Sequence, residues 1–161
     1  MSAFDPRGIL TALERHRVGY VIVGDLAGVL HGSDLTAETV QITPSLKPEN
    51  IERLDQALSD LGATADTRNA LRDLAPDAGP IGMQTTRGEL TLEPSPAGTS
   101  GYPDLRRAAT REPLGQGIRA PVASAPDLVR ILAAQGREQD TALERRLRRV
   151  IEMERTLSPE M

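Results

Sequence analysis

The stretch that decides the fold is residues 18–27, VGYVIVGDLA, followed by LHG at 30–32 and TVQI at 39–42. The run at 20–23 consists of strand-forming residues and stops at Gly24. Residues 26–30 predict a short helix closed by His31-Gly32, and residues 39–42 predict a second strand that Pro44 ends. Gly24 thus stands at a strand-to-helix turn, where close backbone approach favours a residue without a Cβ.

The segments outside this stretch have equally distinct boundaries. Asp5-Pro6 is a good helix start, because a capping acceptor precedes a proline at the first helical position. Arg87-Gly88 joins two strand-like runs and predicts a hairpin. The other expected elements are a helix over 48–62, a loop with a helical turn over 64–80, strands over 81–86, 89–93 and 118–123, a loop over 94–103, and helices over 102–109, 124–135 and 138–155.

This order of elements predicts an α/β (α+β) chain with a mixed sheet, helices on its faces and helices at the C-terminal end. A length of 161 residues suits one domain, and no linker-like tract interrupts it. We therefore expect a single domain over 1–161, with a core over about 5–123 and a C-terminal helical part over about 124–156.

The composition limits the function. Only three aromatic residues are present, which argues against a surface that stacks single-stranded bases. A net charge of -4 gives no general attraction to nucleic acid or to acidic membranes. The absence of cysteine excludes thiolate catalysis and zinc–thiolate sites. No stretch approaches a membrane span and the first residues lack a leader pattern, so we expect a cytoplasmic protein.

Three further segments complete a pattern: Tyr102-Pro103-Asp104-Leu105, residues 124–129 (SAPDLV), and residues 136–140 (GREQD). Together with the strand–glycine–helix–His-Gly–strand order, this set resembles the minimal nucleotidyltransferases, the group that includes abortive-infection type toxins. The resemblance covers roughly residues 9–151. It implies a nucleotidyltransferase-like mixed sheet, metal-dependent chemistry on a nucleotide, and a bacterial toxin–antitoxin or phage-defence setting.

That chemistry needs grouped carboxylates to hold Mg²⁺ ions against the nucleotide phosphates. The resemblance places two of them at alternate positions of a strand, where both side chains share one face, and a third on a later strand. In this sequence the three positions are Thr39, Gln41 and Thr91, all neutral. The second glycine of the phosphate-binding turn is replaced by Asp25, which would repel a phosphate. We therefore expect no metal site, no cofactor and no ordinary nucleotidyl transfer.

Some residues keep two interpretations. The nucleotide-binding candidates are Gly24, Asp25, Arg137 and Asp140, although the last two also suit an ion pair at a helix start. A displaced metal site could use Asp25, Glu38, Glu89 and Glu93, yet Glu38 has the opposite strand parity to Thr39. We expect these four to be ordinary solvated carboxylates instead. For His16 and His31, the only histidines, we expect structural roles.

Three hypotheses of function follow. The first is a catalytically degenerate nucleotidyltransferase-like protein that acts as a binding or regulatory module, through a protein partner. The second is an active nucleotidyltransferase with a non-standard acidic set, Asp25, Glu89 and Glu93, which would require Mg²⁺ and a nucleoside triphosphate. The third is an oligomeric scaffold. Nucleic acid could be contacted through a basic helix face, which is otherwise a solvated surface: Arg145, Arg146, Arg148 and Arg149.

Overall fold

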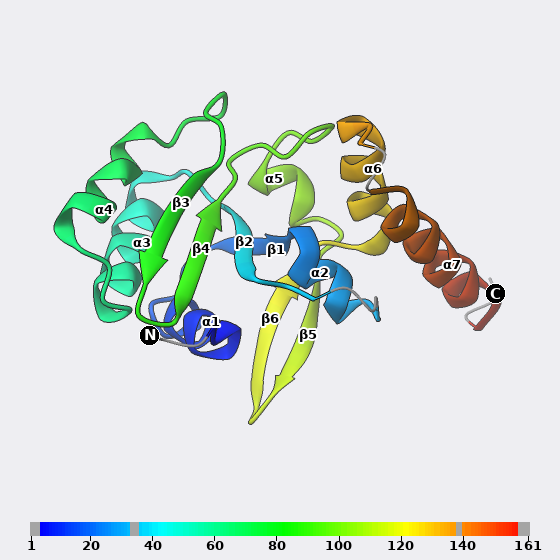
Figure 1. Cartoon of the computed structure of the whole chain (residues 1–161), viewed down its shortest axis with the longest axis horizontal. Helices are drawn as coiled ribbons and strands as arrows, with labels where there is room; N and C mark the ends of the chain where they lie inside the picture. Colours follow the sequence, from blue (N-terminus) through cyan, green and yellow to red (C-terminus); the bar gives the residue numbers. More distant parts are fainter. Residues whose placement is uncertain (1–3, 33–35, 138–139, 158–161) are drawn as a thin grey trace.

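A computed structural model describes residues 4–32, 36–137 and 140–157. Within them, one six-stranded sheet runs through the molecule in the order β3-β4-β2-β1-β6-β5 (Figure 1). The strands are β1 (Tyr20–Val23), β2 (Thr39–Pro44), β3 (Ile81–Thr85), β4 (Gly88–Leu92), β5 (Thr110–Gly115) and β6 (Ile118–Val122).

The sheet is mixed. β1 runs antiparallel to β2 and parallel to β6, and β2 runs parallel to β4. β3–β4 and β5–β6 are antiparallel hairpins at the two edges, and the β5–β6 hairpin projects from the body of the molecule (Figure 1). The register places Val23 opposite Gln41, and Gln41 opposite Thr91. These three positions therefore form one row across the centre of the sheet.

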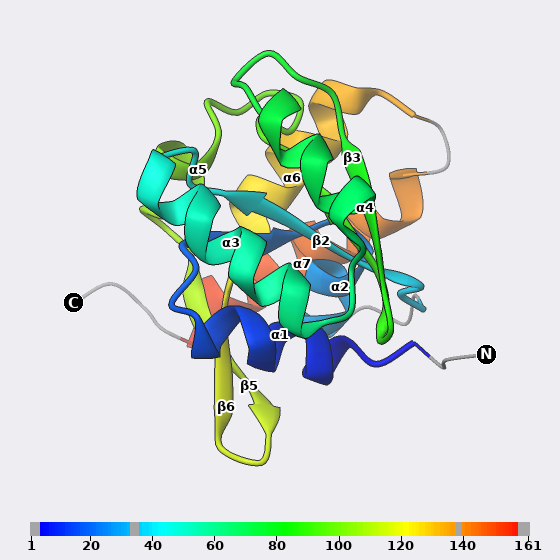
Figure 2. The same ribbon diagram turned by 90° about the vertical axis from the view of Figure 1, so that its left-hand side faces the viewer.

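Helices lie on both sides of this sheet. In Figure 2, α1, α3 and α4 lie in front of it and α2, α6 and α7 behind it. The helices are α1 (Pro6–Arg15), α2 (Gly24–Leu30), α3 (Pro48–Asp60), α4 (Ala65–Asn69), α5 (Tyr102–Leu105), α6 (Ala125–Gln135) and α7 (Thr141–Leu157), with a 3₁₀ turn η1 (Ala70–Asp73) after α4. No helix among the described residues is long and apolar enough to cross a membrane.

The helix boundaries follow from local chemistry. The Asp5 carboxylate accepts a 3.0 Å hydrogen bond from the Gly8 amide at the start of α1, and Ser124 accepts a 3.1 Å bond from the Asp127 amide at the start of α6. Both side chains satisfy amides that lack a partner within the helix. Gly136 ends α6 with a φ of 63°, a left-handed conformation that glycine adopts without penalty.

The two faces of the sheet differ in polarity. Val40, Ile42, Leu90 and Leu92 are fully buried on the face that α1 contacts. The alternate residues of β2 and β4 point to the other face and are only partly buried: Thr39, Gln41, Glu89 and Thr91. The sheet thus has an aliphatic side that stabilises the fold and a polar side next to α2, α6 and α7.

The predicted α/β architecture with a mixed sheet and C-terminal helices is confirmed, as is the hairpin at Arg87-Gly88. Two expectations need correction: strand β5 was not predicted, and the expected helix over 102–109 ends at Leu105. The helical turn expected within the loop over 64–80 is present as α4 followed by η1. The expected start of the last helix at Glu138 lies outside the described residues.

Candidate functional site

A small cavity lies on the polar side of the sheet, where the N-terminus of α2, the middle of β2, the residue after β4 and helices α6 and α7 meet. Its volume is about 60 Å³. Polar groups line one part of it: Asp25, Gln41, Glu93, Gln135 and Arg137. Apolar side chains line the rest: Val23, Pro96, Leu128, Ile131, Leu132, Leu143 and Leu147.

Gly24 forms the turn between β1 and α2 at the edge of this cavity. Its φ is +72°, a conformation that disfavours any residue with a Cβ. A Cβ at Gly24 would also overlap the side-chain amide of Gln41. Gln41 therefore lies directly against the backbone of the turn, because the register already places its strand position beside Val23. The space next to the turn is filled by an amide.

Arg137 is the cation of the cavity. It forms a two-pronged ion pair with Asp140, Nε to Oδ2 at 2.7 Å and Nη2 to Oδ1 at 3.2 Å, and donates a third bond to Gln135 Oε1 at 3.0 Å. The hydrogen bond to Asp140 is the main reason that the pKa of Arg137 is raised, and the charges of Asp25 and Glu93 raise it further. The guanidinium thus lies within the electrostatic reach of both cavity carboxylates.

Glu93 is the partly buried carboxylate of the cavity. Burial raises the pKa of Glu93 above its usual value, and the nearby charge of Arg137 opposes the shift without cancelling it. Its backbone amide donates to the Ile42 carbonyl at 2.8 Å, which extends the β2–β4 pairing past the end of β4. The carboxylate therefore sits at the end of the polar row on β4.

The donor set does not fit the Mg²⁺ ions that the resemblance implies. Asp25 and Glu93 share the cavity with a guanidinium, and burial favours the protonated form of Glu93. The strand positions expected to carry carboxylates have neutral side chains that cannot offset a divalent charge. In the described part of the chain, no group of three or more His, Asp or Glu side chains lies close enough to hold a metal ion.

The other predicted residues lie around the cavity. Thr91 pairs with Gln41 in the sheet, and Thr39 pairs with Glu89, but none of Thr39, Glu89, Thr91 and Asp140 is among the residues that line the cavity. Glu38 is exposed just before β2. His16 pairs with Asp60, and His31 Nε2 lies 2.8 Å from the Ala123 carbonyl, where it ties the end of α2 to the end of β6.

The basic face predicted for the last helix is present on α7. Its four arginines are exposed: Arg145, Arg146, Arg148 and Arg149. Arg148 forms an ion pair with Glu144 one turn earlier, at 2.9 Å. This pair is the interleaving of charges that a solvated helix face shows.

The sequence did not reveal which residues close the cleft. Leu128, Ile131 and Leu132 of α6, with Leu143 and Leu147 of α7, fill its apolar side. The sequence predicted the helices that carry these residues, but the part of the sheet that they cover is set by long-range packing. The cavity that remains is smaller than the roughly 300–1,000 Å³ of ordinary ligand pockets.

Comparison with known proteins gives matches in structure alone. No family model and no curated protein sequence matches the chain. The lincomycin-bound crystal structure of the lincosamide antibiotic adenylyltransferase LnuA aligns with a TM-score of 0.62 and 14% identity, over 92% of this chain and 99% of that one. A candidate nucleotidyltransferase, TM1012 from Thermotoga maritima, aligns with a TM-score of 0.59 and 13% identity, over 90% of this chain and 94% of that one. At this level of identity the likeness concerns the fold, and the chain therefore has a nucleotidyltransferase-like fold.

Proposed function

We propose that this chain is a catalytically degenerate nucleotidyltransferase-like protein that acts as a binding or regulatory module. One observation carries the proposal: the cleft beside the Gly24 turn is filled by the Gln41 amide and by leucines of α6 and α7. A nucleotide would have to displace both, and its phosphates would then meet the Asp25 carboxylate.

The chemistry of the cleft supports the same conclusion. Metal-dependent transfer requires anionic ligands that hold the ions and stabilise the attacking and leaving oxygens. The matching positions here are Thr39, Gln41 and Thr91, and the cavity arginine is already held by Asp140 in a two-pronged ion pair. A guanidinium in that arrangement has fewer donors left for a phosphate group.

Thermal stability with added nucleotides tests the proposal. A ligand that binds only the folded state raises its stability, by about 2.7 kcal/mol at a concentration one hundred times its Kd. We expect no rise in the melting temperature of the wild type with Mg²⁺ and any of the common nucleoside triphosphates. Transfer of a labelled nucleotide by the purified wild-type protein would contradict the proposal.

A gain-of-function variant provides the positive arm. The combination Asp25→Gly, Thr39→Asp, Gln41→Asp and Thr91→Asp removes the amide from the turn and restores the carboxylates that the resemblance implies. We expect this variant to show a Mg²⁺-dependent rise in melting temperature with nucleotide. The matched control carries Asn at positions 39, 41 and 91, which keeps the shapes without the charges.

A second candidate rests on one specific observation. Asp25 and Glu93 line the same cavity, which is what an active enzyme with a displaced acidic set would require of two of its members. Under this alternative, Asp25→Asn and Glu93→Gln would each abolish Mg²⁺-dependent transfer of a labelled nucleotide. Loss of transfer in Glu89→Gln as well would identify Glu89 as the third metal ligand. Activity that survives both single variants would remove the alternative.

The partner and setting of the module are also proposals. The resemblance implies a bacterial toxin–antitoxin or phage-defence role with a protein partner, and the scaffold hypothesis implies self-association of the chain. Light scattering over a concentration series separates these. A mass that rises with concentration supports self-association. A mass that stays at that of the monomer excludes self-association and supports a role with a different protein as partner.

A further inference from the structure

A second, larger hollow lies at the other end of β1, away from the cleft. It is an open groove of about 920 Å³. Gly19 at the start of β1, Pro44 at the end of β2, the N-terminus of α3 and helix α5 contribute to its walls. Because the cleft begins at Gly24, beyond the opposite end of the same strand, the two hollows are separate.

The groove is basic although the protein is acidic. Its described lining contains five cations, Arg17, Lys47, Arg53, Arg106 and Arg107, and one carboxylate, Glu49. The chain as a whole has a net charge of -4. Positive charge is therefore concentrated here, and a concave surface with charge of one sign focuses the field at its centre.

These five cations have no carboxylate within ion-pair distance among the described residues, although Arg53 donates to the Arg17 carbonyl and Arg106 covers the Tyr102 ring. All five side chains are exposed, and none forms an ion pair with a carboxylate of the described residues. Elsewhere, Arg68, Arg87 and Arg111 are each held by an acidic side chain. An ordinary solvated surface intersperses its charges, so the unpaired cluster points to an anionic ligand.

The floor of the groove is rigid. The Gly19 amide donates to Asn50 Oδ1 at 2.6 Å, and Asn50 Nδ2 donates to the carbonyls of Gly19 at 3.0 Å and Ser45 at 2.8 Å. Asn50 is itself buried, at 5% exposure, and ties the first turn of α3 to the ends of β1 and β2. This network holds the first part of α3, next to Lys47 and Arg53, against the sheet.

From these observations we infer that the groove binds the phosphate backbone of a nucleic acid. Guanidinium groups suit phosphate oxygens, since they donate in a planar fork. The groove carries five cations that can each contact a phosphate, and its single aromatic ring, Tyr102, is covered by Arg106, whose guanidinium carbon lies 5.9 Å from the ring centroid. With so little aromatic surface, contacts to phosphate outweigh base stacking, and binding is independent of sequence.

Fluorescence anisotropy of the full-length protein with labelled oligonucleotides of mixed sequence, single-stranded and duplex, tests this inference. Backbone binding of this kind has a Kd of roughly 10⁻⁶–10⁻⁴ M near physiological salt and weakens steeply as salt is added. The variant Arg53→Glu/Arg106→Glu should weaken binding by about tenfold or more and lower the logarithmic salt slope by roughly 1.5, because each phosphate contact contributes about 0.7–0.9.

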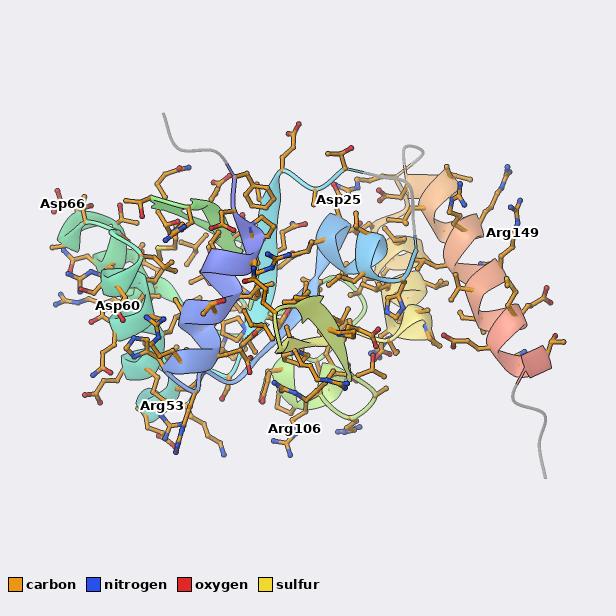
Figure 3. All side chains as sticks on the ribbon, turned by 90° about the horizontal axis from the view of Figure 1, so that it is seen from below. Asp25, Arg53, Asp60, Asp66, Arg106 and Arg149 are labelled. Carbon is orange, nitrogen blue, oxygen red and sulfur yellow. The ribbon has the colours of Figure 1, made fainter. Side chains whose placement is uncertain are left out.

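The matched control is Arg145→Glu/Arg149→Glu on α7, which changes the net charge equally. Figure 3 shows Arg53 and Arg106 on one side of the molecule and Arg149 at its far end. The control should retain wild-type affinity. Arg17→Gln/Lys47→Gln provides a milder groove variant, and circular dichroism checks that each protein is folded.

Three results would overturn the inference. The first is the absence of oligonucleotide binding by the wild type at low salt. The second is loss of binding in the α7 variant while the groove variants bind normally. The third is competition by polyglutamate as effective as competition by unlabelled oligonucleotide, which would assign the groove to an acidic protein segment. None of these readouts depends on nucleotidyl transfer, so the inference and the proposed function fail separately.

Discussion

At the scale of single residues, the contact between Gly24 and Gln41 determines the state of the cleft. We predict that Gly24→Ala destabilises the fold by about 2–4 kcal/mol, since the left-handed conformation costs an alanine ~1–2 kcal/mol and the overlap with the Gln41 amide adds a similar amount. Denaturant unfolding measures this change. The double variant Gly24→Ala/Gln41→Ala should recover the steric part; purely additive effects would show that the two residues do not touch.

The partly buried carboxylate of Glu93 leads to a pH-dependent prediction. Because the folded protein raises the pKa of Glu93 from 4.5, the stability linked to this group is fully present below pH 4.5 and is lost as the pH rises through the raised value. Glu93→Gln stays neutral, so its melting temperature should exceed that of the wild type at pH 8 and equal it at pH 4. Glu89→Gln, outside the cavity, is the control. A difference that does not change with pH would contradict the burial argument.

At the scale of elements, one hydrogen-bonded group joins three of them. The hydroxyl of Tyr20 on β1 donates to Glu14 of α1 at 2.7 Å, and Arg111 of β5 donates to the same carboxylate at 2.6 Å. Burial and the Glu14 carboxylate both raise the pKa of Tyr20, so the hydroxyl remains a donor at all ordinary pH values. This group fixes α1 and the β5–β6 hairpin against the centre of the sheet.

We predict that Tyr20→Phe lowers the free energy of unfolding by about 1–2 kcal/mol, because a partly buried charged acceptor loses a donor. Tyr102→Phe is the matched control, since its hydroxyl has no hydrogen-bond partner among the described residues. Equal losses in the two variants would mean that the hydrogen bond from Tyr20 to Glu14 adds no stability of its own. Chemical denaturation followed by circular dichroism measures both.

The elements that the sequence predicted are those with a buried face or a distinct boundary. Gly24, Pro44 and Ser124 mark ends that the structure shows within a residue or two. β5 escaped prediction because it is an edge strand with exposed residues and Pro113 in it, so it lacks an apolar alternation. α4 and η1 contain one buried side chain, Leu71, and therefore no helical stripe.

The site was predictable to a similar degree. Strand parity placed Gln41 and Glu93 on the face that forms the cavity, and the glycine turn placed Gly24 beside them. The closure of the cavity by α6 and α7 was not predictable, because it depends on the angle at which two distant helices return to the sheet. The basic groove likewise combines residues from five separate segments, and no local pattern connects them.

At the scale of the whole molecule, the prediction of one domain depends on the docking of α6 and α7. Leu147 is 1% exposed and packs into the cleft. Leu147→Asp buries an unpaired charge, which costs about 3–5 kcal/mol, and we expect the midpoint of a single cooperative transition to fall. Met153→Asp, at a position 62% exposed on the same helix, should leave it unchanged.

Two measurements test whether the C-terminal helices unfold together with the sheet: thermal unfolding by circular dichroism and amide hydrogen exchange. In a single domain, both report one transition, because the parts unfold together. If Leu147→Asp removed protection from α7 alone and the sheet kept its midpoint, the C-terminal helices would form a separate cooperative unit.

Lys47, on the rim of the basic groove, is the only lysine in the chain. Acylating reagents attack amines and spare guanidinium groups, so apart from the α-amino group they have one target. A dye ester would therefore label this position selectively without any engineered cysteine, and the yield of the adduct, read by mass spectrometry, would report how far an occupant shields the rim. Because arginine replaces lysine almost everywhere in the chain, Lys47 is the one side chain that an amine-reactive reagent modifies.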